Sequence, residues 1–334
     1  MAVDERVLLV RAGAPALKLP LHQIVTSWPH LFEILLAALP AACYLRGRAL
    51  VRFEQTADSV EARFADGTLI EGDLLIAADG INSTVRSIVA PASKPEYAGY
   101  IAWRGLVRES EMTSGTHRAI GDRFAFYLPP GEEILGYPVS GPGNSLLPGS
   151  RYYNVVWYRG ADEHRELARI LTGKDGIRHE LSIPPNLIRD EVIAEMRGDA
   201  QRLLPPPFAE AIRLAPQPFV QAIYEIESPR LVFGRVVLIG DAAFVARPHA
   251  GAGVTKAAGD ALALVRELSA APDHLEQALQ AFEGQRLNFG AIVTHHSRTL
   301  GHLLRTRPPI DPPLDDAARQ LLALTAVAPA AQSG

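Results

Sequence analysis

Two short apolar runs constrain the fold of this chain more than any other feature, because each is followed by an aspartate–glycine pair. Residues 74–78 read Leu-Leu-Ile-Ala-Ala and precede Asp79-Gly80, and residues 236–239 read Val-Val-Leu-Ile and precede Gly240-Asp241. Continuous apolar runs of this length are typical of strands that are buried on both faces. In open α/β sheets, ligands bind beyond the carboxyl ends of the strands. The sequence therefore predicts an α/β fold with ligand-binding loops at these two positions.

A helix is expected after each loop. Asn82-Ser83 offers an N-cap for a short helix that ends near Val89, and a glycine-rich loop through Arg247 to Gly253 leads into a helix over residues 253–268. Exposed N–H groups at the start of the second helix favour an anionic group, and glycine lets the backbone approach a ligand closely. The aspartate of each loop can accept hydrogen bonds from sugar or ribityl hydroxyls. The alternative for each is ordinary turn or cap chemistry.

A hairpin and an antiparallel sheet are predicted from residue patterns elsewhere. Residues 58–79 read as a hairpin with its turn at Asp66-Gly67 and a return strand over residues 69–77. Residues 97–158 are rich in aromatic and β-branched residues punctuated by glycine and proline, which is typical of an antiparallel sheet. Strands are expected over residues 101–107, 124–128, 134–139, 152–158 and 219–227, and helices over residues 162–171, 186–197, 205–214 and 275–304.

Composition and missing motifs exclude several classes of function. The 334 residues carry a net charge of −4, so a basic surface for nucleic acid is not expected. The single cysteine, Cys43, excludes an internal disulfide framework. No metal site is predicted, because His295, His296 and His302 have no carboxylate or cysteine at ligand spacing. The N-terminus does not read as a targeting signal, and the longest apolar stretch, residues 31–45, is too short to span a bilayer, so we expect a cytoplasmic protein.

Two groups of motifs carry a resemblance to a known enzyme family. The first comprises Gly240-Asp241-Ala242-Ala243, Arg247-Pro248-His249, Gly251-Ala252-Gly253 and Asp260-Ala261. The second comprises Leu75 to Gly80 with Ser83, Val85 and Arg86. These resemble the second flavin motif and the Asp-Gly motif of the group A FAD-dependent aromatic hydroxylases, the para-hydroxybenzoate and salicylate hydroxylase type. Residues 97–105, and Arg247-Pro248-His249 with Lys256-Ala257, are similar to the 2,6-dihydroxypyridine 3-monooxygenase branch of that family.

The resemblance implies an α/β fold in which an incomplete Rossmann-like FAD-binding domain is interleaved with a β-rich substrate domain. The FAD-binding domain would span residues 1–96 and 219–305, the substrate domain residues 97–218, and a C-terminal extension residues 306–334. The implied activity is a monooxygenase in which NADH or NADPH reduces FAD and O2 supplies an oxygen atom to an electron-rich, hydroxylated aromatic or pyridine ring. The ring substrate and the oligomeric state, including a homodimer, stay open.

The resemblance also assigns roles to residues of the two loops. Asp241 would bind the ribityl chain, and Pro248 to Gly253 would line the isoalloxazine ring with backbone N–H groups near its N1 and O2 atoms. Asp79 would face the pyrophosphate, and Arg86 would contact a phosphate or the nicotinamide cofactor, with a salt bridge on the helix surface as its alternative. His249 is a candidate acid/base, with packing in the loop as its alternative. The complete set of predicted cofactor-binding residues is Asp79, Gly80, Arg86, Gly240, Asp241, Pro248, Gly251, Ala252 and Gly253.

Substrate contacts are predicted on the strands of the antiparallel sheet. Their alternation makes four aromatic residues candidates for a substrate pocket: Tyr127, Tyr137, Tyr153 and Trp157. Aromatic residues at such spacing also serve as ordinary core, which is the alternative. Arg104 is a candidate for neutralising an oxyanion of the substrate, with a salt bridge in the sheet as its alternative.

The chain departs from the family pattern at its N-terminus. The family begins with a Gly-x-Gly-x-x-Gly unit that binds the ADP half of FAD, and this chain contains no such motif. A sheet without its first strands has an unpaired edge, so we expect weak FAD binding and marginal stability for the chain as written. A non-catalytic remnant, a subunit that needs a partner with the missing unit, and a same-fold reductase or epoxidase are the alternatives.

Overall fold

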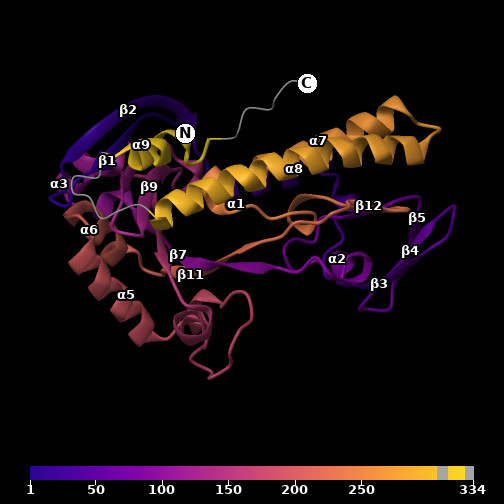
Figure 1. The fold of residues 1–334 in the computed structure, drawn as a ribbon, viewed down its shortest axis with the longest axis horizontal. Coiled ribbons are helices and arrows are strands. Elements are labelled where there is room, and N and C mark those ends of the chain that lie inside the picture. Colours follow the sequence, from indigo (N-terminus) through magenta and orange to yellow (C-terminus); the bar gives the residue numbers. More distant parts are fainter. Residues whose placement is uncertain (307–314, 328–334) are drawn as a thin grey trace. The chain divides into compact units, whose positions relative to one another are not determined.

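The computed structural model describes residues 1–306 and 315–327, and these form two compact units (Figure 1). The first unit comprises Met1–Leu39, Gly99–Ile223 and the described residues from His302 to Ala323; the second comprises Pro40–Ala98, Tyr224–Gly301 and the described residues from Leu324 on. Most of the expected C-terminal extension, residues 307–314 and 328–334, lies outside the described part of the chain. None of the helices in the described ranges combines the length and apolar composition that a membrane span requires.

A seven-stranded sheet dominates the first unit. Its strand order is β11 (Phe219–Glu225), β7 (Glu96–Arg108), β10 (Tyr152–Gly160), β9 (Glu133–Val139), β8 (Phe124–Tyr127), β1 (Ala2–Leu9) and β2 (Pro15–Ile24). The predicted strands of the antiparallel region are confirmed, and the β7–β10, β10–β9 and β9–β8 pairs are antiparallel. Strand β1 joins the sheet by pairing in parallel with β8. Residues 1–39 therefore lie in the first unit, whereas the sequence placed them in the FAD-binding domain.

Two helices of the first unit differ from their expected ranges. The unit contains α1 (Trp28–Ala38), α3 (Ser114–Thr116), α4 (Ala168–Ile170), α5 (Asp190–Leu203), α6 (Pro206–Leu214) and α9 (Asp316–Leu324). The helix expected from residue 186 begins only at Asp190, because Pro185–Leu187 form a separate 3₁₀ turn after Pro184. The helix expected over residues 162–171 is a π turn, Glu163–Leu167, followed by the short α4.

A buried ion cluster anchors the start of the loop after β7. Arg151 donates from Nε to Glu109 Oε2 at 2.8 Å and also pairs through a second nitrogen with Oε1, while His117 Nε2 lies 2.6 Å from Glu109 Oε1. Burial alone would raise the pKa of Glu109, but the hydrogen bonds from Arg151 and His117 outweigh it and lower that pKa to about 2. The cluster therefore stabilises the fold only while Glu109 is ionised.

We expect acid to remove this contribution. Because the folded-state pKa of Glu109 is depressed, its stabilisation is complete above the unfolded pKa near 4.5 and is lost as the pH falls through about 2. The Glu109→Gln variant should be less stable than the parent by roughly 2 kcal/mol at neutral pH, since partial exposure of His117 screens part of the effect. Urea unfolding at several pH values measures this difference, which should shrink toward zero near pH 2. A difference that stays constant with pH would contradict the assignment.

The second unit contains two three-stranded sheets. One has the order β3 (Leu50–Gln55), β4 (Val60–Phe64) and β5 (Leu69–Gly72), and the other β12 (Val232–Phe233), β13 (Val236–Leu238) and β6 (Leu75–Ala77). The predicted hairpin is confirmed for β4 and β5, which pair antiparallel. Its return strand was predicted too long, because the chain leaves β5 at Gly72 and enters the other sheet as β6. There β6 pairs in parallel with β13.

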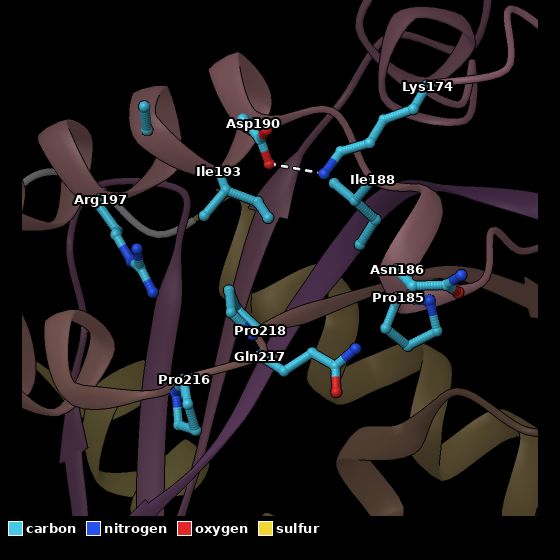
Figure 2. A pocket seen from close by; sticks show the side chains of 11 residues that line it. Lys174, Pro185, Asn186, Ile188, Asp190, Ile193, Arg197, Pro216, Gln217 and Pro218 are labelled. Atoms are coloured by element: carbon cyan, nitrogen blue, oxygen red, sulfur yellow. Dashed lines mark hydrogen bonds and ion pairs between the residues drawn. The ribbon is translucent and has the colours of Figure 1, made fainter.

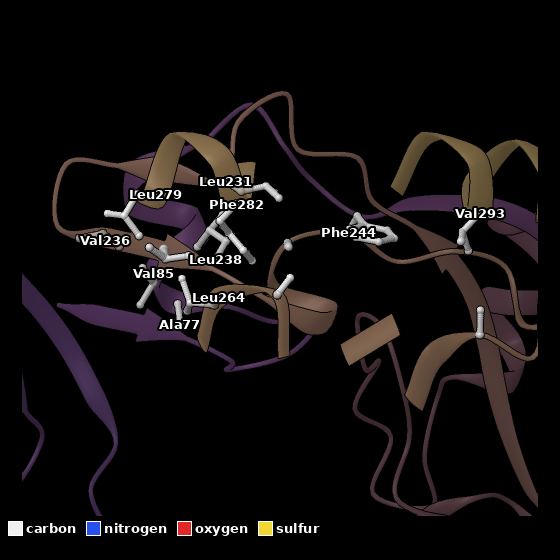
Figure 3. Close-up of a cluster of buried hydrophobic side chains, with 14 of the residues drawn as sticks. Ala77, Val85, Leu231, Val236, Leu238, Phe244, Leu264, Leu279, Phe282 and Val293 are labelled. Atoms are coloured by element: carbon white, nitrogen blue, oxygen red, sulfur yellow. The ribbon is translucent and has the colours of Figure 1, made fainter. Parts of the chain in front are cut away.

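The core of the second unit forms around β13. Its three residues are fully buried among α2 (Thr84–Val89), α7 (Gly253–Ala270) and α8 (Leu275–Thr306), the last of which extends into residues of the first unit. Figure 3 shows Leu279 and Phe282 of α8 gathered with Leu238 of β13 and Leu264 of α7. Strand β6 lies at the edge of its sheet, and Ile76 is 45% exposed. The prediction that both runs are buried on both faces is therefore correct for β13 and wrong for β6.

Candidate functional site

Parallel pairing of β6 with β13 brings the two predicted loops to one sheet edge. Leu238 pairs with Ala77, and the N–H of Ile239 donates to Ala77 O at 3.0 Å. The carboxyl ends of parallel strands lie at the same edge, so Asp79 and Gly240 leave the sheet side by side. Two segments that are far apart in sequence thus form one site.

Asp79 caps the helix that follows it. Its Oδ1 accepts a hydrogen bond from the Ser83 hydroxyl at 2.5 Å, and its Oδ2 accepts one from the Val85 N–H at 3.2 Å. Ser83 is the N-cap of α2, as predicted, because its hydroxyl accepts from the Arg86 N–H at 2.9 Å. The cap role weighed for Asp79 is therefore present, and its predicted position facing a pyrophosphate stays a proposal.

Arg86 joins the two loops. Its side chain is buried, and burial lowers the pKa of the guanidinium. The guanidinium donates to Asp241 O at 3.4 Å and to Ala242 O at 3.2 Å in the second loop. Its other acceptors are backbone carbonyls near its own helix, those of Gly80, Ile81 and Ser93. The alternative of a surface salt bridge is wrong, because the guanidinium is buried and donates its hydrogen bonds to these carbonyls. The predicted contact of Arg86 with a cofactor stays a proposal.

Lys256 holds the carboxylate of Asp241. The lysine is 1% exposed, and its Nζ donates to Asp241 Oδ1 at 2.9 Å and to the Phe244 carbonyl. The ammonium also lies 4.3 Å from the centre of the Phe244 ring. Burial lowers the pKa of Lys256, and the charge of Asp241 opposes that shift. With its side chain 51% exposed, Asp241 keeps a carboxylate oxygen directed to solvent or a ligand.

A second buried pair fixes the start of the same loop. Asp260 on α7 accepts from the Gly240 N–H at 2.8 Å through Oδ2 and from Arg286 Nε at 2.6 Å through Oδ1. Arg286 comes from α8 and also lies 4.1 Å from the ring centre of Phe289. Gly240 has a φ of +59°, a conformation that glycine adopts without strain. Sequence reasoning included Asp260 in the motif but gave it no role; its spacing of four residues from Lys256, on one helical face, was the available signal.

Backbone hydrogen bonds and close packing hold the loop before α7 in place. Pro248 begins a 3₁₀ turn, Pro248–Ala250, in which His249 is fully buried. The Gly251 N–H donates to Pro248 O at 2.9 Å, and its predicted place near a flavin stays a proposal. Gly251 has a φ of +60°, and a Cβ there would lie 2.6 Å from Ala326 Cα. The following helix begins at Gly253 with no side-chain cap, which leaves its first N–H groups as the donors at this site.

The four aromatic substrate candidates divide between the two faces of the seven-stranded sheet. Cross-strand pairing places Tyr127 and Trp157 opposite Ile134, and Tyr153 lies on the same face because it is four residues from Trp157. Tyr137 pairs with Asn154 and so lies on the other face. Tyr127, Tyr153 and Trp157 are buried, and Trp157 Nε1 donates to Glu132 at 2.8 Å. Burial of these three fits the core alternative, whereas Tyr137 is half-buried, and a place in a substrate pocket stays a proposal for all four.

One pocket of the first unit lies away from all predicted site residues. Its volume is about 440 Å³, and its polar lining includes Lys174 and Asp190, whose charged groups lie 2.7 Å apart (Figure 2). Asn186, Arg197 and Gln217 complete the polar part of the wall. The lysine is already paired with a carboxylate, and Arg197 donates to the carbonyl of Ala215 at 2.8 Å.

Comparisons with known proteins agree with the geometry. Residues 97–225 match a family described as FAD binding domain-like, and residues 227–297 match the FAD binding domain family. The chain is 32% identical over 265 residues to 2,6-dihydroxypyridine 3-monooxygenase of Paenarthrobacter nicotinovorans, covering 79% of this chain and 65% of that protein. It is 30% identical over 297 residues to salicylate hydroxylase of Pseudomonas putida, covering 83% of this chain and 62% of that protein. The chain thus spans less than two thirds of the length of these relatives.

A solved structure extends the similarity to the fold. The structure of 2,6-dihydroxypyridine-3-hydroxylase from Arthrobacter nicotinovorans superposes with a TM-score of 0.87 at 28% sequence identity. The match covers 95% of this chain and 79% of that one. The parallel β6–β13 pair, the two loops at its edge and these matches lead to one conclusion: residues 227–297 belong to the FAD binding domain family, and the chain is similar in sequence and fold to FAD-dependent aromatic hydroxylases.

Proposed function

We propose that the chain is an FAD-dependent monooxygenase that uses NAD(P)H and O2 to hydroxylate an electron-rich, hydroxylated aromatic or pyridine ring. The observation that carries the proposal is the pairing of β6 with β13, which unites the Asp79 and Asp241 loops, with Arg86 bonded to both. The relatives named for ring hydroxylation support the substrate class. We further propose that the second unit binds FAD and that the first unit binds the ring.

The residues of the second unit fit FAD. Gly80 has a φ of +78°, and no atom lies within 4 Å of the position that a Cβ would occupy there; the same open space lies beside Gly253. Both glycines therefore allow a ligand to approach the backbone closely. The uncapped start of α7 offers N–H donors and the positive end of the helix dipole. Asp241 adds a half-exposed acceptor that is already oriented by Lys256.

Each group then has a defined task. Asp241 accepts hydrogen bonds from ribityl hydroxyls, and the first N–H groups of α7 stabilise negative charge on the edge of the isoalloxazine ring. The Asp79 loop, with Gly80, lies toward the pyrophosphate. Buried His249 holds the loop and is the candidate for moving a proton near the ring. Bound FAD supplies the redox chemistry, by passing electrons from NAD(P)H to O2.

The partners that we propose are small molecules: the ring substrate and O2, with neither nucleic acid nor membrane. A cytoplasmic location also remains part of the proposal. Association into a homodimer is left to a direct measurement of mass in solution.

The test is a visible spectrum of the purified chain after addition of FAD and removal of the excess, followed by turnover in labelled O2. Retained flavin bands and one labelled oxygen atom in the product from 2,6-dihydroxypyridine or salicylate would support the proposal. A chain that retains no flavin would be a remnant or a partner-dependent subunit. Retained flavin with NAD(P)H oxidation but no labelled ring hydroxyl would identify a reductase or an epoxidase instead.

A further inference from the structure

One face of the seven-stranded sheet carries polar groups that the proposed function has not yet used. Arg104 on β7 pairs with Val156 of β10, and Tyr137 on β9 pairs with Asn154 of β10. Residues two apart along a strand share a face, so Asn154 and Tyr158 lie on the face that carries Arg104 and Tyr137. We call these four residues the Arg104 cluster.

Arg104 differs from Arg151 and Arg159, two other buried or half-buried arginines of its unit. Arg151 and Arg159 each pair with two carboxylates. Arg104 is half-buried, and among the described residues it forms no ion pair; its Nε is buried without a hydrogen-bond partner. The salt bridge expected as its ordinary role is therefore missing. A buried N–H group of a cation that has no hydrogen-bond acceptor lowers the stability of the fold, unless a ligand supplies the acceptor.

The neighbours of Arg104 do not neutralise it. Two phenols, those of Tyr137 and Tyr158, face Arg104. Burial raises the pKa of both phenols, and the positive charge of Arg104 opposes that shift. The buried carboxylate on this face is Glu133, which also interacts with Arg6. Arg6 in turn donates to Gln23 at 2.9 Å and lies 5.0 Å from the Phe124 ring centre. The charge of Glu133 thus acts on Arg6, a second buried cation.

The cluster is accessible and suited to an aromatic ring. Leu106, on the same face of β7, is 44% exposed, and Arg104, Tyr137 and Asn154 are half-buried. The Tyr137 ring lies 4.9 Å from that of Phe124, and the Asn154 side chain hydrogen-bonds the Tyr137 hydroxyl. A cation beside aromatic side chains and hydrogen-bonding groups matches a flat ring that carries a negative oxygen.

We propose that Arg104 is the specificity-determining residue of the first unit and binds an anionic oxygen attached to an aromatic or pyridine ring. The Tyr137 hydroxyl, fixed by Asn154, provides the second polar contact. This inference rests on the proposed function, because the ring is the substrate of the proposed hydroxylation. It selects acidic ring compounds over neutral ones of the same shape.

Equilibrium dialysis of the full chain against salicylate and its neutral analogue salicylamide tests the proposal. We expect the parent to prefer salicylate and the Arg104→Met variant to bind it about 10- to 100-fold more weakly, with little change for salicylamide. Arg104→Lys should retain part of the preference because it keeps the charge. Arg178→Met, which removes an exposed guanidinium of the same unit, is the matched control and should behave like the parent.

Two results would overturn the inference. One is a parent that binds salicylate no better than salicylamide or does not bind it saturably. The other is an Arg104→Met variant, folded by circular dichroism, that keeps the parental preference. Dialysis needs neither bound flavin nor turnover, so a chain that discriminates through Arg104 but inserts no oxygen would refute the proposed function and leave this inference standing.

Discussion

Replacing Asp260 with alanine is expected to lower the free energy of unfolding by about 3–5 kcal/mol. The carboxylate is buried and is bonded to Arg286 and to the Gly240 N–H. Its removal leaves a buried guanidinium without its counter-charge and a buried N–H without its acceptor. Urea unfolding followed by far-UV circular dichroism measures the loss, because α7 and α8 contribute strongly to that signal.

Matched variants separate the charge effect from a general loss of packing. Asp273→Ala removes an exposed carboxylate between α7 and α8 and should change stability by less than about 0.5 kcal/mol. The double variant Asp260→Leu with Arg286→Met removes both charges and should recover much of the stability that Asp260→Ala loses. If Asp260→Ala unfolds like the parent, the pair cannot be what anchors Gly240.

The loops of the site were predictable because their signals are local. The apolar runs before Asp79 and Gly240 mark β6 and β13, and Ser83 marks a helix cap, all of which the structure contains. The role of Arg86 was not predictable, because it bonds to Asp241 O and Ala242 O, which lie 155 and 156 residues away. Only tertiary structure reveals which carbonyls a buried guanidinium reaches.

The sheet of the first unit illustrates a different limit. Alternation identified its central strands, but it does not say which face of a strand another layer covers, so Tyr137 was grouped with Tyr153 although they lie on opposite faces. Strand β2 was missed even though Leu17, Leu19 and Leu21 alternate with polar or proline residues, a pattern that was available. The marginal stability and weak FAD binding stay predictions.

Removing the Asp241 carboxylate is expected to weaken FAD binding about 10- to 100-fold, since charge-assisted hydrogen bonds to the ribityl chain would be lost. The single Asp241→Ala variant also leaves the buried ammonium of Lys256 without its carboxylate partner at 2.9 Å. The effect of this variant on FAD affinity would therefore be mixed with a loss of stability.

A double-mutant cycle separates the two effects. Lys256→Met leaves the half-exposed Asp241 carboxylate in place and should keep most of the FAD affinity. Asp241→Ala with Lys256→Met removes both charges, so thermal stability should recover relative to Asp241→Ala alone while FAD affinity stays low. Quenching of flavin fluorescence on binding gives the dissociation constants for all four proteins. If the double variant binds FAD as tightly as the parent, Asp241 does not contact the cofactor, and its exposed carboxylate serves only as the counter-charge of Lys256.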